Sequence, residues 1–189
     1  MDPNDFTPRQ QELFHHLLRD VLAQGFSGFT IDRAVRDYHC SKSTIYALGR
    51  NRDEILRQLL ISFFRDVTRQ VTAATEQDGS CAQQLDSYFT AMARALEPAS
   101  AAFMRDMARE QVAQEVYSVN TQAAVAQVDR LLTRGVAEGE FTLDSVEFTS
   151  QLIQRSLTDI QQGFYHDVLP TGAAYAAFGR LVLGGLAQR

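Results

Sequence analysis

Lysine, tryptophan and cysteine are scarce in this sequence of 189 residues. Lys42 is the only lysine, tryptophan is absent, and the two cysteines, Cys40 and Cys81, stand far apart. Two cysteines at that spacing make no disulfide framework and match no metal or redox motif. The scarcity of cysteine therefore favours a reducing, cytosolic compartment, and it predicts no bound metal.

Several other features are missing, and each absence excludes a class of protein. No uninterrupted apolar run is long enough to span a bilayer, and residues 1–10 lack the basic and apolar regions of a signal peptide. A net charge of -5 and a pI of about 5.3 speak against a general nucleic-acid coat protein. A glycine-rich phosphate loop, a nucleophile elbow and a paired-carboxylate motif are also missing. We therefore expect a cytoplasmic protein that is not an enzyme, uses no cofactor and does not bind a membrane.

Helical spacing of apolar residues recurs along nearly the whole chain, and alternating β-branched runs are absent. For example, Leu13, Phe14, Leu17 and Val21 repeat at three to four residues and precede Gly25, a common helix stop. This pattern predicts an all-α protein of about nine helices. The expected helices span residues 9–24, 31–37, 42–46, 52–75, 81–96, 98–117, 117–138, 144–166 and 171–187.

The stretch from Ser41 to Tyr46 carries the single lysine among hydroxyl side chains. Ser41 can cap a helix that starts at Lys42, because its oxygen can accept the free N–H groups of the first turn. Such a helix would bury Ile45 and expose the polar side chains around it. A short capped helix of this kind suits a recognition helix in a DNA groove. Residues 30–57 also hold six basic side chains against four acidic ones, a small positive bias on an acidic chain.

The sequence around this stretch resembles the TetR family of bacterial transcriptional regulators. The resemblance rests on Gly25–Ile31, on Ser41–Tyr46 and on Arg52–Leu56, and it is strong over residues 25–56 and general beyond them. It implies a helix-turn-helix head at residues 1–51. It also implies a helical ligand-binding and dimerisation domain at residues 52–189, with the helix at 52–75 connecting the two.

Four positions depart from the family's pattern. Val35 replaces alanine, and His39 stands where the turn usually has glycine, so we expect His39 to adopt a positive φ. Leu48 and Gly49 replace a tyrosine and a phenylalanine after the recognition helix. These departures keep open an alternative in which the head has lost specific DNA binding and the chain is a ligand-binding or protein-interaction module.

The resemblance assigns DNA contacts to seven residues, each of which could otherwise be an ordinary solvated side chain. Lys42 and Ser43 are expected to face base edges, where a lysine can donate to guanine. The remaining five are expected to hold phosphates: Thr30, Arg33, Thr44, Tyr46 and Arg52.

A regulator of this family binds a palindromic double-stranded operator as a homodimer, since two recognition helices then face two half-sites. Near-heptad apolar stripes on the last two helices are the expected dimer face, although part of them must cover the monomer's own core. The residues are Ile153, Leu157, Ile160, Phe164, Tyr175, Phe178 and Val182.

The resemblance also implies a small-molecule effector bound among the fifth to seventh helices. Large, adaptable apolar side chains there predict a mainly apolar effector, with ordinary core packing as the alternative for each residue. The candidates are Tyr88, Phe89, Met92, Phe103, Met107 and Tyr117. The expected function is a ligand-responsive repressor that leaves its operator when the effector binds.

Overall fold

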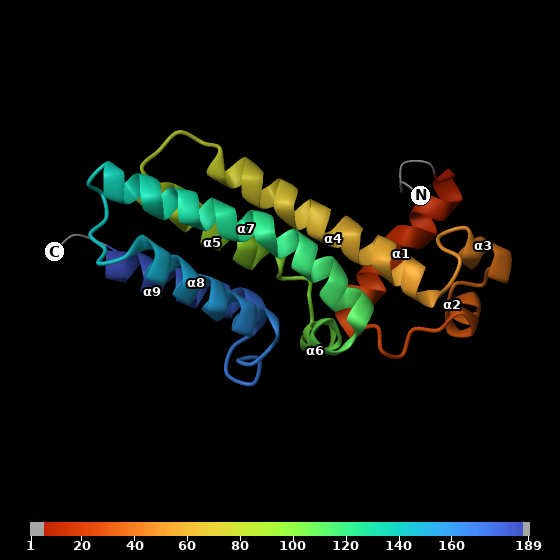
Figure 1. Ribbon diagram of the computed structural model, residues 1–189. Coiled ribbons are helices and arrows are strands. Elements are labelled where there is room, and N and C mark those ends of the chain that lie inside the picture. The colour runs from red at the N-terminus through yellow and green to blue at the C-terminus, as the bar shows by residue number, and fades with distance from the viewer. Residues whose placement is uncertain (1–5, 187–189) are drawn as a thin grey trace. The chain divides into compact units, whose positions relative to one another are not determined.

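The computed structural model describes residues 6–186, and for residues 120–125 it describes the helical backbone alone. Within these residues the elements are nine α-helices, as Figure 1 shows, so the predicted all-α class is confirmed. They are α1 (Pro8–Gln24), α2 (Ile31–Asp37), α3 (Lys42–Tyr46), α4 (Arg52–Thr75), α5 (Cys81–Ala95), α6 (Ala101–Arg109), α7 (Gln111–Ala137), α8 (Val146–Gln161) and α9 (Thr171–Leu186).

Local capping explains where several helices begin. Thr7 and Gln10 form a capping box at the start of α1, with Pro8 in the first helical position. Ser80 and Gln83 form another at the start of α5. These side chains satisfy N–H groups that have no partner inside the helix, so the sequence fixes these boundaries locally.

Four predicted helix boundaries are wrong. The sixth helix begins after Ser100, which caps it, and it ends before Glu110, whose backbone is extended at φ -88° and ψ 129°. The boundary between α6 and α7 therefore lies at Glu110 and not near Tyr117. Helix α8 begins after Ser145, which caps it, rather than at residue 144, and it ends at Gln161, well before residue 166. Gly163 follows with a φ of +77°, a conformation that cannot continue a right-handed helix.

The chain packs as two compact units. The first consists of residues up to 65 together with 98–117, and the second of residues 66–97 together with the chain from 118 onward. The predicted domain boundary at residue 51 stays a prediction, but the packing shows that α6 and the start of α7 belong with the head. Helices α4 and α7 contribute residues to both units.

The core of the first unit is aromatic. The centroid of the Phe103 ring, on α6, lies 5.7 Å from the Phe26 ring centroid and 5.5 Å from the Phe63 ring centroid. Both ring pairs have edge-to-face geometry. The Ser100 N–H donates to the Leu22 carbonyl at 2.9 Å, which fixes the start of α6 against the end of α1. Helix α6 is thus part of the structure that supports the head.

The second unit is built on α5 and α9, which pack along each other. A Cβ added to Gly179 would lie 2.5 Å from the Phe89 Cβ, so glycine is what permits this close approach. The buried Tyr175 hydroxyl donates to the Gln161 side chain at 3.2 Å. Among the described helices, none is both long and apolar enough to cross a membrane.

Candidate nucleic-acid interface

The turn before α3 has the backbone that a glycine would usually provide. His39 has a φ of +48°, and it is the only non-glycine residue with positive φ in the described part of the chain. The prediction for His39 is therefore confirmed. The Cys40 N–H donates to the Val35 carbonyl at 3.2 Å and closes the turn. The protein forms the helix-turn-helix bend without glycine, at a strain of about 1–2 kcal/mol.

The turn is also tied to α1 through Tyr38, whose hydroxyl donates to the Asp20 carboxylate in a short hydrogen bond. Burial raises the pKa of Tyr38, and the hydrogen bond to Asp20 raises it further. The phenol therefore stays protonated at all physiological pH values and holds α2 against α1.

Helix α3 presents its polar side chains outward. The Ser41 hydroxyl accepts from the Thr44 N–H at 3.2 Å, which confirms the predicted cap. Ile45 is fully buried, while Lys42, Ser43 and Tyr46 are exposed and Thr44 is partly exposed. The hydroxyls of Ser43 and Thr44 lie 2.7 and 2.9 Å from the Ser41 hydroxyl. This is the face that the sequence predicts for a recognition helix.

The two atypical residues after α3 have clear structural roles. Leu48 is buried at 1% exposure and belongs to the core. A Cβ added to Gly49 would lie 2.8 Å from the Ile55 backbone nitrogen, because the start of α4 passes close by. The departures from the family's pattern therefore fit the packing of the head and do not disrupt it.

The only lysine is held by a neighbouring carboxylate. Lys42 Nζ lies 2.7 Å from Asp32 Oδ1, and both side chains are largely exposed. The hydrogen bond between them lowers the pKa of Asp32 and raises the pKa of Lys42. Sequence reasoning missed Asp32 as a member of this surface, although an acidic residue in the first turn of α2 is a normal helix-start feature.

The residues predicted at the start of α2 are also exposed. The Thr30 hydroxyl accepts from the Arg33 N–H at 3.2 Å and caps the helix. The Arg33 guanidinium lies 3.3 Å from the Asp37 carboxylate, in a pair that is more than half exposed on each side. Both side chains are exposed to solvent, so each can reorient to contact a phosphate.

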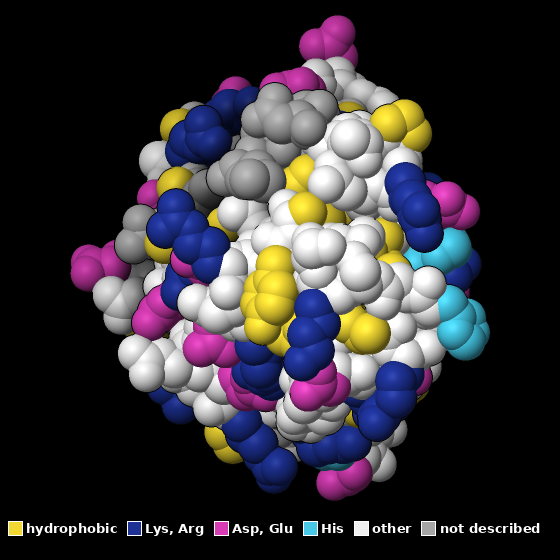
Figure 2. Space-filling model, turned by 90° about the vertical axis from the view of Figure 1, so that its right-hand side faces the viewer, with side chains coloured by type: hydrophobic (Ala, Val, Ile, Leu, Met, Phe, Trp, Pro, Cys, Tyr) yellow, Lys and Arg dark blue, Asp and Glu magenta, His cyan; other side chains and the backbone are white. Residues whose placement is uncertain are grey.

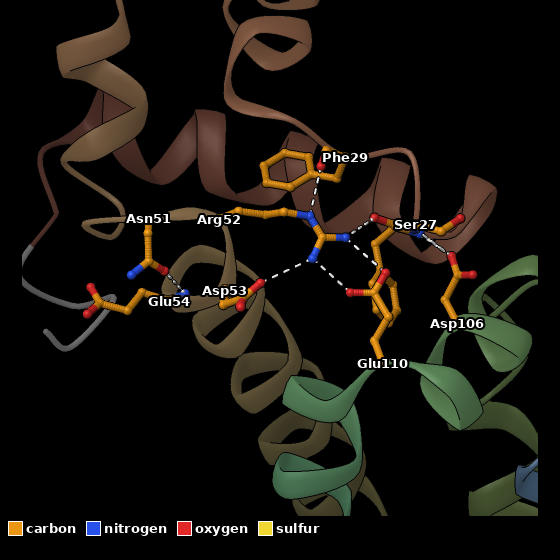
Figure 3. A network of polar contacts seen from close by, with 9 residues as sticks. Ser27, Phe29, Asn51, Arg52, Asp53, Glu54, Asp106 and Glu110 are labelled. Carbon is orange, nitrogen blue, oxygen red and sulfur yellow. Dashed lines mark hydrogen bonds and ion pairs between the residues drawn. The ribbon is translucent and has the colours of Figure 1, made fainter.

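Arg52 is different, because its guanidinium is already occupied within the protein (Figure 3). It forms a bidentate pair with Glu110 at 2.7 and 2.9 Å. It also donates to the Phe29 and Phe26 carbonyls at 2.9 and 2.8 Å, and to Asp53 at 3.1 Å. The hydrogen bond to Glu110 raises the pKa of Arg52. All five of its N–H donors therefore have acceptors within the protein. The predicted phosphate contact by Arg52 stays a prediction.

Acidic and basic side chains are mixed on the face shown in Figure 2, which is the right-hand side of Figure 1 and carries the head. The basic groups do not form a continuous patch in that view. The head also contains exposed pairs of opposite charge, Lys42 with Asp32 and Arg33 with Asp37. Any DNA affinity of this surface must come from a few specific side-chain contacts rather than from a broad positive electrostatic potential.

The six candidate effector residues fall into two groups. Phe103, Met107 and Tyr117 belong to the first unit, and Tyr88, Phe89 and Met92 belong to the second. All but Tyr117 are buried. A cleft of about 310 Å³ lies elsewhere, between α1 and α2, beside Asp20, Arg33 and Tyr38. The effector-binding role of the six residues stays a prediction.

The predicted dimer residues divide by exposure. Ile153, Ile160 and Tyr175 are at most 6% exposed and form part of the core of the second unit, and their role at a dimer interface stays a prediction. Leu157, Phe178 and Val182 are partly exposed, and Phe164 is 70% exposed. The most exposed apolar side chains on α8 and α9 lie outside the predicted set: Phe148, Leu152 and Leu181.

One group in the described residues has metal-ligand side chains, namely Cys81, Glu138 and Glu140 within 4.8 Å of one another. The Arg134 Nε donates to the Cys81 Sγ at 2.9 Å and lies 3.6 Å from the Glu138 carboxylate. Glu140 accepts from the first two N–H groups of α5, each at 3.1 Å. Burial raises the pKa of the Cys81 thiol, and Arg134 partly offsets this. The contacts within this group explain its close packing without a metal ion: Glu140 caps α5, and Arg134 supplies positive charge beside Cys81 and Glu138.

Comparison with known proteins supports the fold at low sequence identity. No family model and no curated protein sequence matches the chain. A fatty-acid degradation regulator from Bacillus halodurans superposes with a TM-score of 0.74 at 16% identity, covering 98% of this chain and 100% of its own. A ketosteroid transcriptional regulator from Mycobacterium tuberculosis superposes at 0.71 and 16% identity, covering 98% of each chain. A TetR-family regulator from Agrobacterium tumefaciens superposes at 0.73 and 11% identity, covering 99% of this chain and 100% of its own.

These similarities extend over almost the whole length of both chains in each pair. The protein therefore has the fold of the TetR-family transcriptional regulators, with a helix-turn-helix at its N-terminal end.

Proposed function

We propose that this protein is a member of the TetR family that binds an operator as a homodimer and represses transcription until a small apolar effector releases it. The observation that carries the proposal is α3. It is a Ser41-capped helix with Ile45 buried and Lys42, Ser43 and Tyr46 exposed, in a fold shared along its length with known regulators. The alternative of a head without DNA binding finds no support in its packing, because Leu48 and Gly49 fit the core.

In this proposal Lys42 and Ser43 contact base edges, and Tyr46 and Thr44 donate to phosphates. The full or partial exposure of these side chains on α3 supports the assignment. Thr30 and Arg33, at the start of α2, would hold the backbone beside the groove. Arg52 has no such role in this proposal.

Homodimerisation would join two heads at a fixed separation on a palindrome. The surface for it is the outer side of α8 and α9, where Phe148, Leu152 and Leu181 are 54–72% exposed. Exposed apolar side chains of this size are costly unless a partner covers them.

An apolar effector is supported by two observations. Helices α5 and α6 each carry buried aromatic and methionine side chains, and methionine adapts readily to differently shaped ligands. Similar structures are named as regulators of fatty-acid degradation and as a ketosteroid regulator. Long-chain fatty acyl compounds and steroid acids are therefore the first effectors to test.

The DNA-binding test starts from duplexes selected from a random-sequence library by the full-length protein. We expect the selected duplex to be palindromic and to bind at least about 100-fold tighter than a random duplex, with affinity falling steeply as salt rises. The matched control is the double variant Lys42→Ala/Tyr46→Ala, which changes only exposed side chains of α3. Equal binding to selected and random duplexes up to micromolar protein would sink the proposal.

The effector test uses the same selected duplex. Addition of a fatty acyl compound or a steroid acid should lower operator affinity at least about tenfold, and the ligand should bind the free protein more tightly than the DNA complex. If the ligand binds and leaves operator affinity unchanged, the repressor-release part of the proposal is wrong.

A further inference from the structure

Asp106, near the end of α6, has a buried carboxylate that accepts hydrogen bonds from the loop after α1. Its side chain accepts from the Phe26 N–H at 2.5 Å and from the Ser27 N–H at 2.8 Å, and the residue is 8% exposed. Gly25 just before has a φ of +79°, and a Cβ there would lie 2.5 Å from the Asp106 carboxylate. The loop and the carboxylate fit each other so closely that only glycine is compatible with this position.

Glu110, one turn further along, holds Arg52 at the first residue of α4. The pair is bidentate, and the two side chains are 21% and 30% exposed. Arg52 at the same time donates to the carbonyls of Phe26 and Phe29. Figure 3 shows both carboxylates reaching from the end of α6 to the segments on either side of the helix-turn-helix.

The two carboxylates therefore act on the two ends of one segment. Residues 30–51 contain α2, the turn and α3, and they begin just after the loop bonded to Asp106 and end just before Arg52. We propose that Asp106 and Glu110 are positioning residues for DNA binding, which fix both ends of the helix-turn-helix and so set how α3 is presented. This proposal rests on the DNA-binding function proposed above.

The strength of this arrangement comes from its partial burial. Exposed ion pairs stabilise proteins very little, because water solvates and screens both charges. Charge-assisted hydrogen bonds that are shielded from water contribute more, and removal of one partner leaves the other without an acceptor. Loss of Glu110 would leave Arg52 with two unused donors in a half-buried site, and the start of α4 would no longer be fixed to α6.

The chain offers a matched control for Glu110. Arg57 of α4 and Glu115 of α7 form a pair at 2.6 Å, but their side chains are 41% and 46% exposed. The hydrogen bond from Arg57 lowers the pKa of Glu115. This pair joins the side chains of α4 and α7, whereas Glu110 lies between α6 and α7 and pairs with the first residue of α4. Glu115→Ala therefore removes an equivalent charge without touching the loop after α1.

The experiment compares Glu110→Ala, Glu110→Gln and Asp106→Asn with Glu115→Ala in the full-length protein. For each variant, binding is measured to the selected duplex and to a random duplex of equal length, alongside circular dichroism and solution mass. We expect Glu110→Ala and Asp106→Asn to weaken binding to the selected duplex about 10-fold or more. Their affinity for the random duplex should change by less than about twofold. Glu110→Gln, which keeps an acceptor oxygen, should fall between these and the wild type, and Glu115→Ala should match the wild type.

Three results would overturn the proposal. Wild-type binding by folded Glu110→Ala would show that the contact positions nothing. A parallel loss on both duplexes, in step with a lower unfolding temperature, would show a structural role alone. Tighter binding to both duplexes, with a salt dependence steeper by about one phosphate contact, would show that Arg52 is a phosphate ligand masked by Glu110. Failure of the wild type to prefer its selected duplex would instead refute the proposed function itself.

Discussion

Lys42 Nζ lies 2.7 Å from Asp32 Oδ1, so the residue best suited to read a base edge is paired with a carboxylate of the same head. The pair joins the start of α3 to the start of α2, and it is open to solvent on both sides. DNA bound as proposed would therefore compete with Asp32 for the Lys42 ammonium group. Asp32 also places a negative charge on a surface that is proposed to face phosphates.

Removal of that carboxylate gives the first prediction. Asp32→Asn should raise affinity for both selected and random DNA by about two- to fivefold at low salt, with the gain shrinking as salt rises and screens the charge. Fluorescence anisotropy at several salt concentrations measures this. Asp78→Asn, an identical charge change in the loop after α4, is the control and should have no such effect. Weaker binding by Asp32→Asn would mean that Asp32 orients Lys42 for the base instead of competing with it.

Tyr46 and Lys42 should differ in what they contribute. Tyr46→Ala is expected to weaken binding to all duplexes by a similar factor, since a phosphate contact carries no sequence information. Lys42→Ala should weaken binding to the selected duplex more than binding to other duplexes, because a good base contact discriminates against the wrong base by about 1–3 kcal/mol. Competition binding against single-base variants of the selected duplex separates the two. If Lys42→Ala leaves base preference unchanged, α3 does not read the groove as proposed.

Most of the head could be predicted from the sequence because its determinants are local. The cap at Ser41, the buried position of Ile45 and the positive φ of His39 all depend on residues within a few positions. The roles of Arg52, Asp106 and Glu110 depend on partners 58 to 80 residues away, and no local pattern predicts them. One signal was available, since Asp106 lies three residues after Phe103 on the buried side of α6, where a charged residue is unusual.

The body was predicted less well, for a related reason. Apolar periodicity identifies α8 and α9 as helices but cannot say which apolar side chains face the protein's own core. Helix α9 is apolar on much of its circumference, so Tyr175 and Leu181 look alike in sequence although they are 1% and 72% exposed. The boundary at Glu110 was missed because Glu110 lies in an extended conformation where it binds Arg52, and apolar periodicity does not mark such a break.

The strained turn gives a stability prediction. His39→Gly should stabilise the protein by about 0.5–1 kcal/mol, since glycine relieves about 1–2 kcal/mol of strain at a φ of +48° and loses about 0.5–1 kcal/mol through its greater freedom in the unfolded chain. His39→Val, with a β-branched side chain, should destabilise it. Urea unfolding measures both. A loss of stability in His39→Gly would show that the imidazole itself makes a stabilising contact.

Gly49 gives the opposite expectation at a nearby position. Gly49→Ala places a methyl group 2.8 Å from the Ile55 backbone nitrogen, and backbone cannot move aside as a flexible side chain can. We expect a loss of about 2–4 kcal/mol in the free energy of unfolding. Gly184→Ala, at a helical position with open space around the new methyl group, is the control and should be neutral or slightly stabilising. Equal effects of the two substitutions would contradict the close approach of α4 to Gly49.

The exposed apolar surface of α8 and α9 gives the last prediction. Leu181→Arg or Phe148→Glu should convert a dimer to a monomer, because each places a charge on a side chain that is 72% or 66% exposed in the isolated chain and covered in the proposed dimer. The control is Val119→Glu, which changes an equally exposed apolar residue on α7. Sedimentation velocity gives the mass of each variant, and the monomeric variants should lose affinity for a palindrome but not for a single half-site. A dimer that survives both substitutions would place the interface on another surface.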